Sequence, residues 1–247
     1  MIKLSLGYSI NPYFNQHIDL EIYQLIFQKI GLPVSNIRNT LIKSGIPHLL
    51  GLGSYKITNK NGDIKLPPEV TEKIDAALND PNTLNVLLID PNPHFKNIED
   101  VTYITELEKI RNNLKQFKDN SFRRRVFLAQ NISTTIMKHI SEISYKHQLP
   151  IDFFLKKGGS KKDFDNLLEN IPTGLVYVYL QLYRDMQFDR AIQKNDLEDI
   201  FGLTLALPLC DVILTEKMWL SIIKRAKLDR TCRVDVIHSI TQFYSYL

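Results

Sequence analysis

The stretch NDLEDIFGLTLALPLCDVILTEKMWLSIIKRAKLDRTCRVDVIH, residues 195–238, decides the fold class. Residues 195–207 have the apolar spacing of an amphipathic helix that begins at Asn195, and Pro208 ends this helix. CDVILT is a short apolar strand, EKMWLSIIKRAKL is a second helix, and RVDVIH is a second strand. Because helices alternate with strands, we expect a parallel α/β layer with right-handed crossovers.

Helical periodicity dominates the rest of the chain, so the fold class is expected to be α/β and mainly helical, with a small parallel sheet and an additional helical region. The run 174–188 suits a buried strand by composition, but its length and spacing favour a helix. A Gly- and Asn-rich loop or hairpin is expected before Pro68. The remaining expected helices span residues 19–30, 37–45, 67–77, a short run from Asp80, 98–147 with a break near Asp119, and 161–170 with a cap at Ser160.

Two regions follow from this pattern. Residues 1–150 are expected to be a mainly helical region, either an insertion or the remainder of a truncated domain, and residues 151–247 are expected to be the C-terminal α/β unit. The composition, with 44% hydrophobic and 23% charged residues, is that of a folded globular protein. The longest apolar run, 201–214, is too short for a membrane span, and the N-terminus does not resemble a secretory signal, so a cytoplasmic location without membrane contact is expected.

Acidic residues gather where the parallel layer would bind a ligand. Asp196 and Asp199 lie three residues apart in the first turn of their helix, and Thr215 and Glu216 follow the strand CDVILT. These positions share the carboxyl edge of the layer, which is the usual ligand-binding edge. Asp211 begins the same strand, about 13 Å away at roughly 3.3 Å per residue, so it is expected to be structural.

Carboxylates that converge at one edge need a counter-charge, and Mg²⁺ or Mn²⁺ would supply it through oxygen ligands. Asp196, Asp199 and Glu216 are the expected metal ligands, and such a metal could activate water against a phosphodiester. The alternative is that the acids simply favour a helix N-terminus. The six histidines have no metal-ligand spacing and are expected to be structural, Trp219 is expected in the core, and Cys210 and Cys232 are expected to be buried free thiols.

The run NDLEDIFGLTLALPLCDVILTEKMW resembles the C-terminal motif of PIN-like metal-dependent nucleases, and the similarity covers roughly residues 171–247. The resemblance implies catalytic roles for Asp199 as the helix aspartate, Asp196 as its support, and Thr215 with Glu216 as the residues that close a Mg²⁺ or Mn²⁺ site. PIN-type domains also begin with a strand that ends in aspartate, whereas this N-terminus has no acid before Asp19. That strand is therefore expected on an upstream polypeptide or a second subunit.

Two basic runs complete the expected site. Arg123, Arg124 and Arg125 form one run, and Lys161 and Lys162 belong to the other, and both could hold phosphates of RNA or single-stranded DNA. The resulting hypothesis is a metal-dependent ribonuclease of a toxin or defence setting, in which assembly as a homo-oligomer is an open option. The alternative is a catalytically inactive nucleic-acid-binding or protein-interaction module of the same fold.

Overall fold

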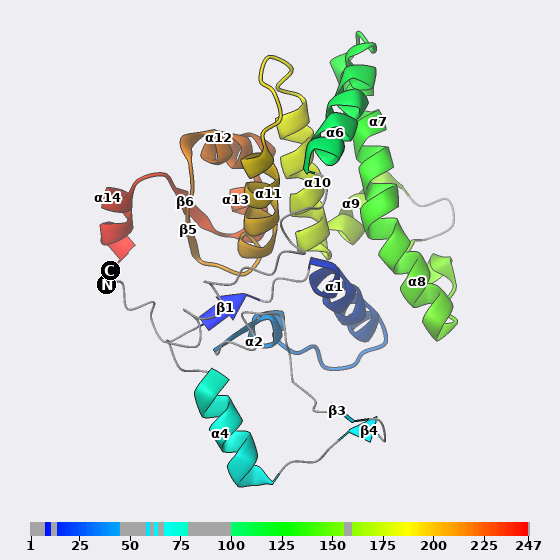
Figure 1. Ribbon diagram of the computed structural model, residues 1–247. Coiled ribbons are helices and arrows are strands. Elements are labelled where there is room, and N and C mark those ends of the chain that lie inside the picture. The colour runs from blue at the N-terminus through cyan, green and yellow to red at the C-terminus, as the bar shows by residue number, and fades with distance from the viewer. Residues whose placement is uncertain are drawn as a thin grey trace. The chain divides into compact units, whose positions relative to one another are not determined.

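The computed structural model describes residues 8–10, 14–44, 58–59, 62–63, 67–78, 100–155 and 160–246 (Figure 1). The chain divides into two compact units. The first comprises residues 1–13 and 36–99, and the second comprises residues 14–35 and 100–247. Helices from both sides of residue 150 therefore belong to the second unit.

The first unit contains two small antiparallel ladders. Strand β1 (Tyr8–Ile10) pairs with β2 (Ile42–Ser44), and β3 (Thr58–Asn59) pairs with β4 (Gly62–Asp63), which confirms the expected hairpin before Pro68. Helix α4 (Pro68–Leu78) also begins as predicted. The helix expected over residues 37–45 is wrong in length, since α2 (Ile37–Leu41) ends where β2 pairs with β1. The short helix expected from Asp80 lies outside the described residues.

The second unit is mainly helical. The expected break in residues 98–147 is confirmed, because Asp119 caps a new helix by accepting a hydrogen bond from the Ser121 N–H at 2.8 Å. The helical prediction for residues 174–188 is confirmed up to Asp185, where α10 ends. The helices are α1 (Phe14–Lys29), α6 (Asp100–Lys115), α7 (Asn120–Ile132), the π-helical turn η3 (Ser133–Met137), α8 (Lys138–His147), the 3-10 turn η4 (Ile151–Phe153), α9 (Lys161–Glu169), α10 (Pro172–Asp185), α11 (Lys194–Ala206), α12 (Lys217–Ala226), α13 (Leu228–Cys232), α14 (Ile240–Phe243) and the 3-10 turn η5 (Tyr244–Tyr246).

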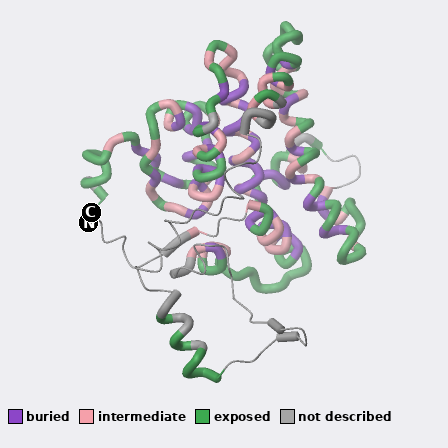
Figure 2. The backbone as a smooth tube through the Cα atoms, in the orientation of Figure 1, coloured by how far each residue is buried: buried purple, intermediate pink, exposed green. Residues whose placement is uncertain are grey.

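Helix α10 is the central element of this unit. It contacts α1, α7, α9, α11 and α12, and most of its residues are buried, whereas α14 is exposed (Figure 2). Gly174 allows η3 to approach α10 closely, because a Cβ atom at this position would lie 2.8 Å from Ile136 Cγ1. None of the described helices has both the length and the apolarity that a bilayer crossing requires.

The C-terminal layer contains the predicted parallel pair. Strand β5 (Val212–Leu214) runs parallel to β6 (Asp235–Ile237), with Ile213 opposite Val236. Helix α12 lies between the two strands in the chain and buries Trp219, Ile222 and Ile223. An α/β fold that is mainly helical and has a small parallel sheet is thus confirmed.

Candidate functional site

Asp196 lies at the start of α11 and is fully engaged by the protein itself. Its side chain is only 3% exposed, and its two carboxylate oxygens accept hydrogen bonds from Arg190 Nη1 at 2.8 Å and Nη2 at 2.7 Å. The Gln193 backbone N–H donates a further bond to Oδ2 at 2.9 Å. The predicted cap at Asn195 is wrong by two residues, since Gln193 is the N-cap and Asp196 satisfies its N–H.

Asp199 lies one turn later and contacts the predicted core tryptophan. Trp219 Nε1 donates a hydrogen bond to Asp199 Oδ2 at 2.8 Å, and the tryptophan is fully buried, as expected. A buried indole N–H needs a partner, and Asp199 is that partner. The bond joins α11 to α12 and fixes the position of this carboxylate.

Thr215 and Glu216 occupy the segment between β5 and α12. The Thr215 N–H donates to the Ile237 carbonyl at 2.9 Å, so it extends the parallel ladder. Glu216 is the N-cap residue of α12 and is exposed. Asp211 lies at the other end of β5, where its carbonyl accepts a bond from the Asp235 N–H at 2.9 Å.

Arg190 connects the predicted acids. Its hydrogen bond with Asp196 raises the pKa of the guanidinium above its ordinary value, and the charges of Asp196, Glu216 and Asp199 raise it further, against the opposing effect of partial burial. The three acids therefore act on one shared cation, which is an arginine side chain. We call Arg190, Asp196, Asp199 and Glu216 the acidic cluster.

The acidic cluster as it stands does not fit a divalent metal. Both oxygens of Asp196 and one oxygen of Asp199 accept hydrogen bonds from protein donors, so metal binding would have to displace Arg190. Within the described ranges, no group of three or more His, Cys, Asp and Glu side chains is arranged to hold a metal ion. Sequence reasoning missed Arg190, because this residue lies outside the helices and strands and no periodicity shows its direction.

The first predicted basic run lies against aromatic rings of α10. The Arg124 guanidinium lies 5.3 Å from the centroid of Tyr183 and 5.8 Å from that of Tyr179. Arg225 of α12 lies 5.8 Å from the same Tyr183 ring, so Tyr183 contacts two arginines. Such cation–π contacts position a guanidinium without neutralising its charge.

Aromatic contacts also hold the neighbouring cations. Arg123 lies 4.7 Å from the Phe188 centroid and donates to the Phe117 carbonyl, and Lys115 lies 5.5 Å from Phe188. Arg125 lies 5.9 Å from the ring of Phe122. We call this surface the basic–aromatic face; it comprises Lys115, Arg123, Arg124, Arg125 and Arg225 with Phe122, Tyr179, Tyr183 and Phe188.

The second predicted basic run is elsewhere on the unit. Lys161 is the first residue of α9, and Lys162 is exposed on the same helix. Helix α9 ends just before the N-terminus of α10, whereas the basic–aromatic face lies towards the C-terminal end of α10. The structure therefore does not bring the two runs together.

The remaining sequence expectations concern histidines and cysteines. His139 Nδ1 lies 2.7 Å from Asp19 Oδ1, and Tyr23 Oη lies 2.9 Å from His147 Nε2, so both side chains join helices α1 and α8. Cys210 and Cys232 are free thiols, as expected, although each is half-buried. Burial raises the pKa of the Cys232 thiol to about 12, with smaller contributions from the charges of Glu21 and Asp229.

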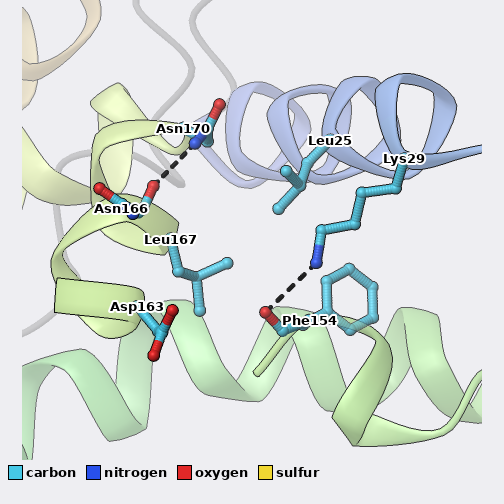
Figure 3. A pocket seen from close by; sticks show the side chains of 7 residues that line it. All are labelled: Leu25, Lys29, Phe154, Asp163, Asn166, Leu167 and Asn170. Atoms are coloured by element: carbon cyan, nitrogen blue, oxygen red, sulfur yellow. Dashed lines mark hydrogen bonds between the residues drawn. The ribbon is translucent and has the colours of Figure 1, made fainter. Parts of the chain in front are cut away.

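A hollow between α1 and α9, of about 160 Å³, offers few free polar groups (Figure 3). Lys29 reaches across it and donates to the Phe153 carbonyl at 2.5 Å and to the Phe154 carbonyl at 3.4 Å. Asp163 belongs to the capping box of α9, and Asn170 Nδ2 donates to the Asn166 carbonyl at 2.7 Å. These bonds explain the polar lining as structural.

Comparison of the chain with protein-family models, curated proteins and solved structures finds no match. The resemblance to PIN-like nucleases therefore stays a hypothesis that rests on residues 171–247.

Proposed function

We propose that this protein binds single-stranded RNA, or single-stranded DNA, through the basic–aromatic face. The observation that carries the proposal is that Arg124, Arg125 and Arg225 form no ion pair with a described carboxylate. Arginines that are held by aromatic rings and have no acidic partner keep their full charge for an external anion.

Phosphodiesters are the anions that best match this surface. Five cations from α6, α7 and α12 contact the aromatic rings of this group, and release of condensed counterions by such cations favours polyanion binding. The rim of the face also carries exposed rings, since Phe117 is 39% and Phe122 is 42% exposed. Exposed rings beside arginines can stack unpaired bases, which favours a single strand over a duplex.

The proposal is tested by fluorescence anisotropy with a labelled single-stranded RNA at several salt concentrations. Combined replacement of Arg124, Arg125 and Arg225 by alanine is expected to weaken binding about tenfold or more at low salt. The slope of log K against log salt should fall by about 2, because three phosphate contacts at roughly 0.7 each are removed.

A matched control removes three positive charges outside the face, by alanine at Lys146, Lys217 and Arg230, all of which are exposed. This variant should retain most of the affinity. Equal losses in the two variants, or wild-type binding without salt dependence, would contradict a specific role for the basic–aromatic face.

A metal-dependent ribonuclease of PIN-like type is the second candidate. The supporting observation is that Asp196, Asp199 and Glu216 all act on the charge of Arg190 and so lie around a single cation. Under this hypothesis Asp196, Asp199 and Glu216 would hold Mg²⁺ or Mn²⁺ in a rearranged site in which Arg190 no longer pairs with Asp196, and such a metal would supply a Lewis acid for phosphodiester hydrolysis.

Asp199→Ala separates the two candidates. Metal-dependent cleavage should be lost in this variant while RNA affinity is unchanged, and circular dichroism should verify that the fold is kept. Cleavage that persists in Asp199→Ala would show that the acidic cluster is not the catalytic site. RNA binding that needs neither Mn²⁺ nor Asp199, without cleavage, would support the binding module alone.

A further inference from the structure

A π-helical turn lines part of a second polar hollow in the second unit. The turn η3 joins α7 to α8, and π turns inside helices occur frequently at functional sites. A hollow of about 190 Å³ opens over this turn, and Asn15, Thr135, Lys138, His139, Glu142 and Tyr177 are among the residues that line it. Neither the predicted acids nor the basic–aromatic face contributes to this hollow.

His139 lines this hollow, and one of its two ring nitrogens is fixed by a hydrogen bond. Nδ1 lies 2.7 Å from Asp19 Oδ1, which accepts a hydrogen bond from the Nδ1–H. Nε2 has no hydrogen-bond partner among the described residues. It is not fully buried, so solvent reaches it. Because the ionised carboxylate of Asp19 can only accept, neutral His139 carries its proton on Nδ1 and presents the Nε2 lone pair.

In the described part of the chain, four ionisable residues line the hollow or bond to His139. Asp19 belongs to α1, Lys138 and Glu142 belong to α8, and Tyr177 belongs to α10. The Lys138 Nζ atom lies 4.0 Å from Glu142 Oε1, and the two side chains are 66% and 60% exposed, so their pairing leaves the ammonium group accessible. An oriented base and an accessible cation therefore border the same hollow.

We propose that this hollow is a metal-independent RNA cleavage site in which His139 is the general base. His139 Nε2 takes the proton of a ribose 2′-hydroxyl, and the 2′-oxygen forms a bond to the adjacent phosphorus. The bond from phosphorus to the 5′-oxygen breaks, water gives a proton to that leaving oxygen, and a 2′,3′-cyclic phosphate results. His139 then returns its proton to solvent.

The other residues support this step. Lys138 offsets negative charge on the phosphoryl oxygens, and Asp19 is a positioning residue that holds the ring and its tautomer. The inference rests on the proposed RNA binding. Arg125 and His139 lie on one continuous helical run, about 20 Å apart at roughly 1.5 Å per residue, so one strand can reach both (Figure 1).

The test follows cleavage of a labelled RNA in excess EDTA and identifies the product ends. The wild-type protein should release 2′,3′-cyclic phosphate, and an RNA with 2′-O-methyl groups should be bound but not cut. His139→Gln, purified identically, should lower the rate about 100-fold or more, whereas His147→Gln should not. His147 is a matched control because it also bonds to a residue of α1.

Two further variants guard against a folding artefact, since His139 is only 9% exposed. Lys138→Ala changes an exposed residue and should reduce cleavage without loss of stability. Asp19→Asn should shift or flatten the rising limb of the rate–pH profile, which a purely structural role would not do. Absence of EDTA-resistant cleavage, products with a 3′-hydroxyl, or an unchanged rate in His139→Gln would overturn this inference. Binding of the 2′-O-methyl RNA is measured separately, so failure of cleavage is distinguishable from failure of RNA binding.

Discussion

The acidic cluster and the basic–aromatic face use opposite strategies for charge. In the acidic cluster, Arg190 pairs with the nearly buried Asp196, and Trp219 donates to Asp199. In the basic–aromatic face, rings of Tyr179 and Tyr183 hold Arg124 in place but leave its charge unpaired. The carboxylate charges of the acidic cluster are paired with groups of the protein itself, whereas the positive charges of the basic–aromatic face are available to an external anion.

Pairing with other protein groups therefore distinguishes structural charges from functional charges. An acid whose oxygens are all bonded to protein donors contributes to stability, so its removal should affect unfolding more than binding. A cation held only by rings costs little stability when removed, so its removal should affect binding more than unfolding.

The largest effect is expected at a buried carboxyl group that forms no ion pair with a described cation. Glu21 is 4% exposed and accepts bonds from the Thr173 N–H at 3.1 Å and from Thr173 Oγ1 at 2.6 Å. Burial raises its pKa from 4.5 to about 8, although the bonds from Thr173 act in the opposite direction. In the folded protein Glu21 is therefore protonated at neutral pH, whereas in the unfolded chain it is ionised.

The stability of the folded protein should therefore fall as the pH rises. The folded state binds the extra proton, so the Glu21 contribution to stability is complete below pH 4.5 and is lost as the pH rises to about 8. Within this window the free energy of unfolding should fall by up to about 1.4 kcal/mol per pH unit. Urea unfolding of wild type and Glu21→Gln at several pH values measures this slope. The exposed control Glu169→Gln should have the same pH slope of the free energy of unfolding as the wild type. A wild-type slope equal to that of Glu21→Gln would contradict the prediction.

Arg190→Ala is the second prediction. Removal of the guanidinium leaves the buried Asp196 carboxylate without its two charged hydrogen bonds, so the free energy of unfolding should fall by about 2–3 kcal/mol. Denaturant unfolding provides the measurement. In a double-mutant cycle, Asp196→Asn should make the loss at Arg190 much smaller, and additive losses would show that the pair is not coupled.

Much of the fold could be predicted because its signals are local. Apolar spacing located α1, α10 and α12, and Pro208 marked the end of α11. Residues 42–44 were misassigned because their strand conformation depends on pairing with β1, a partner about 34 residues earlier in the chain. The helix expected over residues 19–30 is confirmed as part of α1, and Ile22, Leu25 and Ile26 are buried, but Ile30 is 53% exposed and lies beyond the helix end at Lys29.

The candidate site was predictable only in part. Helix and strand order placed Asp196, Asp199 and Glu216 near one edge, and their shared effect on Arg190 supports that proximity. The identity of the counter-charge was not predictable, because Arg190 lies in a loop with no periodicity to reveal its direction. The contacts between Arg124 and α10 were likewise hidden, since Tyr179 and Tyr183 are more than 50 residues away in the sequence.

Trp219→Phe is the third prediction and tests the link between α11 and α12. Phenylalanine keeps most of the apolar surface but removes the N–H that donates to Asp199. Stability should fall by about 1–2 kcal/mol, from the lost bond and the smaller ring. Thermal unfolding followed by circular dichroism measures the loss. Asp199→Asn in the Trp219→Phe background should then cost almost nothing, and a large further loss would show that Asp199 has another structural partner.

The smallest effect is expected at Lys162, which belongs to the predicted basic run but not to the basic–aromatic face. This side chain is exposed on α9 and has no aromatic ring or carboxylate contact among the described residues, so nothing fixes its position. A mobile surface ammonium contributes to binding mainly through the general field, which salt screens. Lys162→Ala should therefore change RNA affinity less than twofold at physiological salt, whereas Arg124→Ala should weaken it several-fold. A loss of RNA affinity at Lys162 as large as that at Arg124 would contradict this prediction. It would show that a cation held by aromatic rings contributes no more to RNA binding than an unconstrained surface cation.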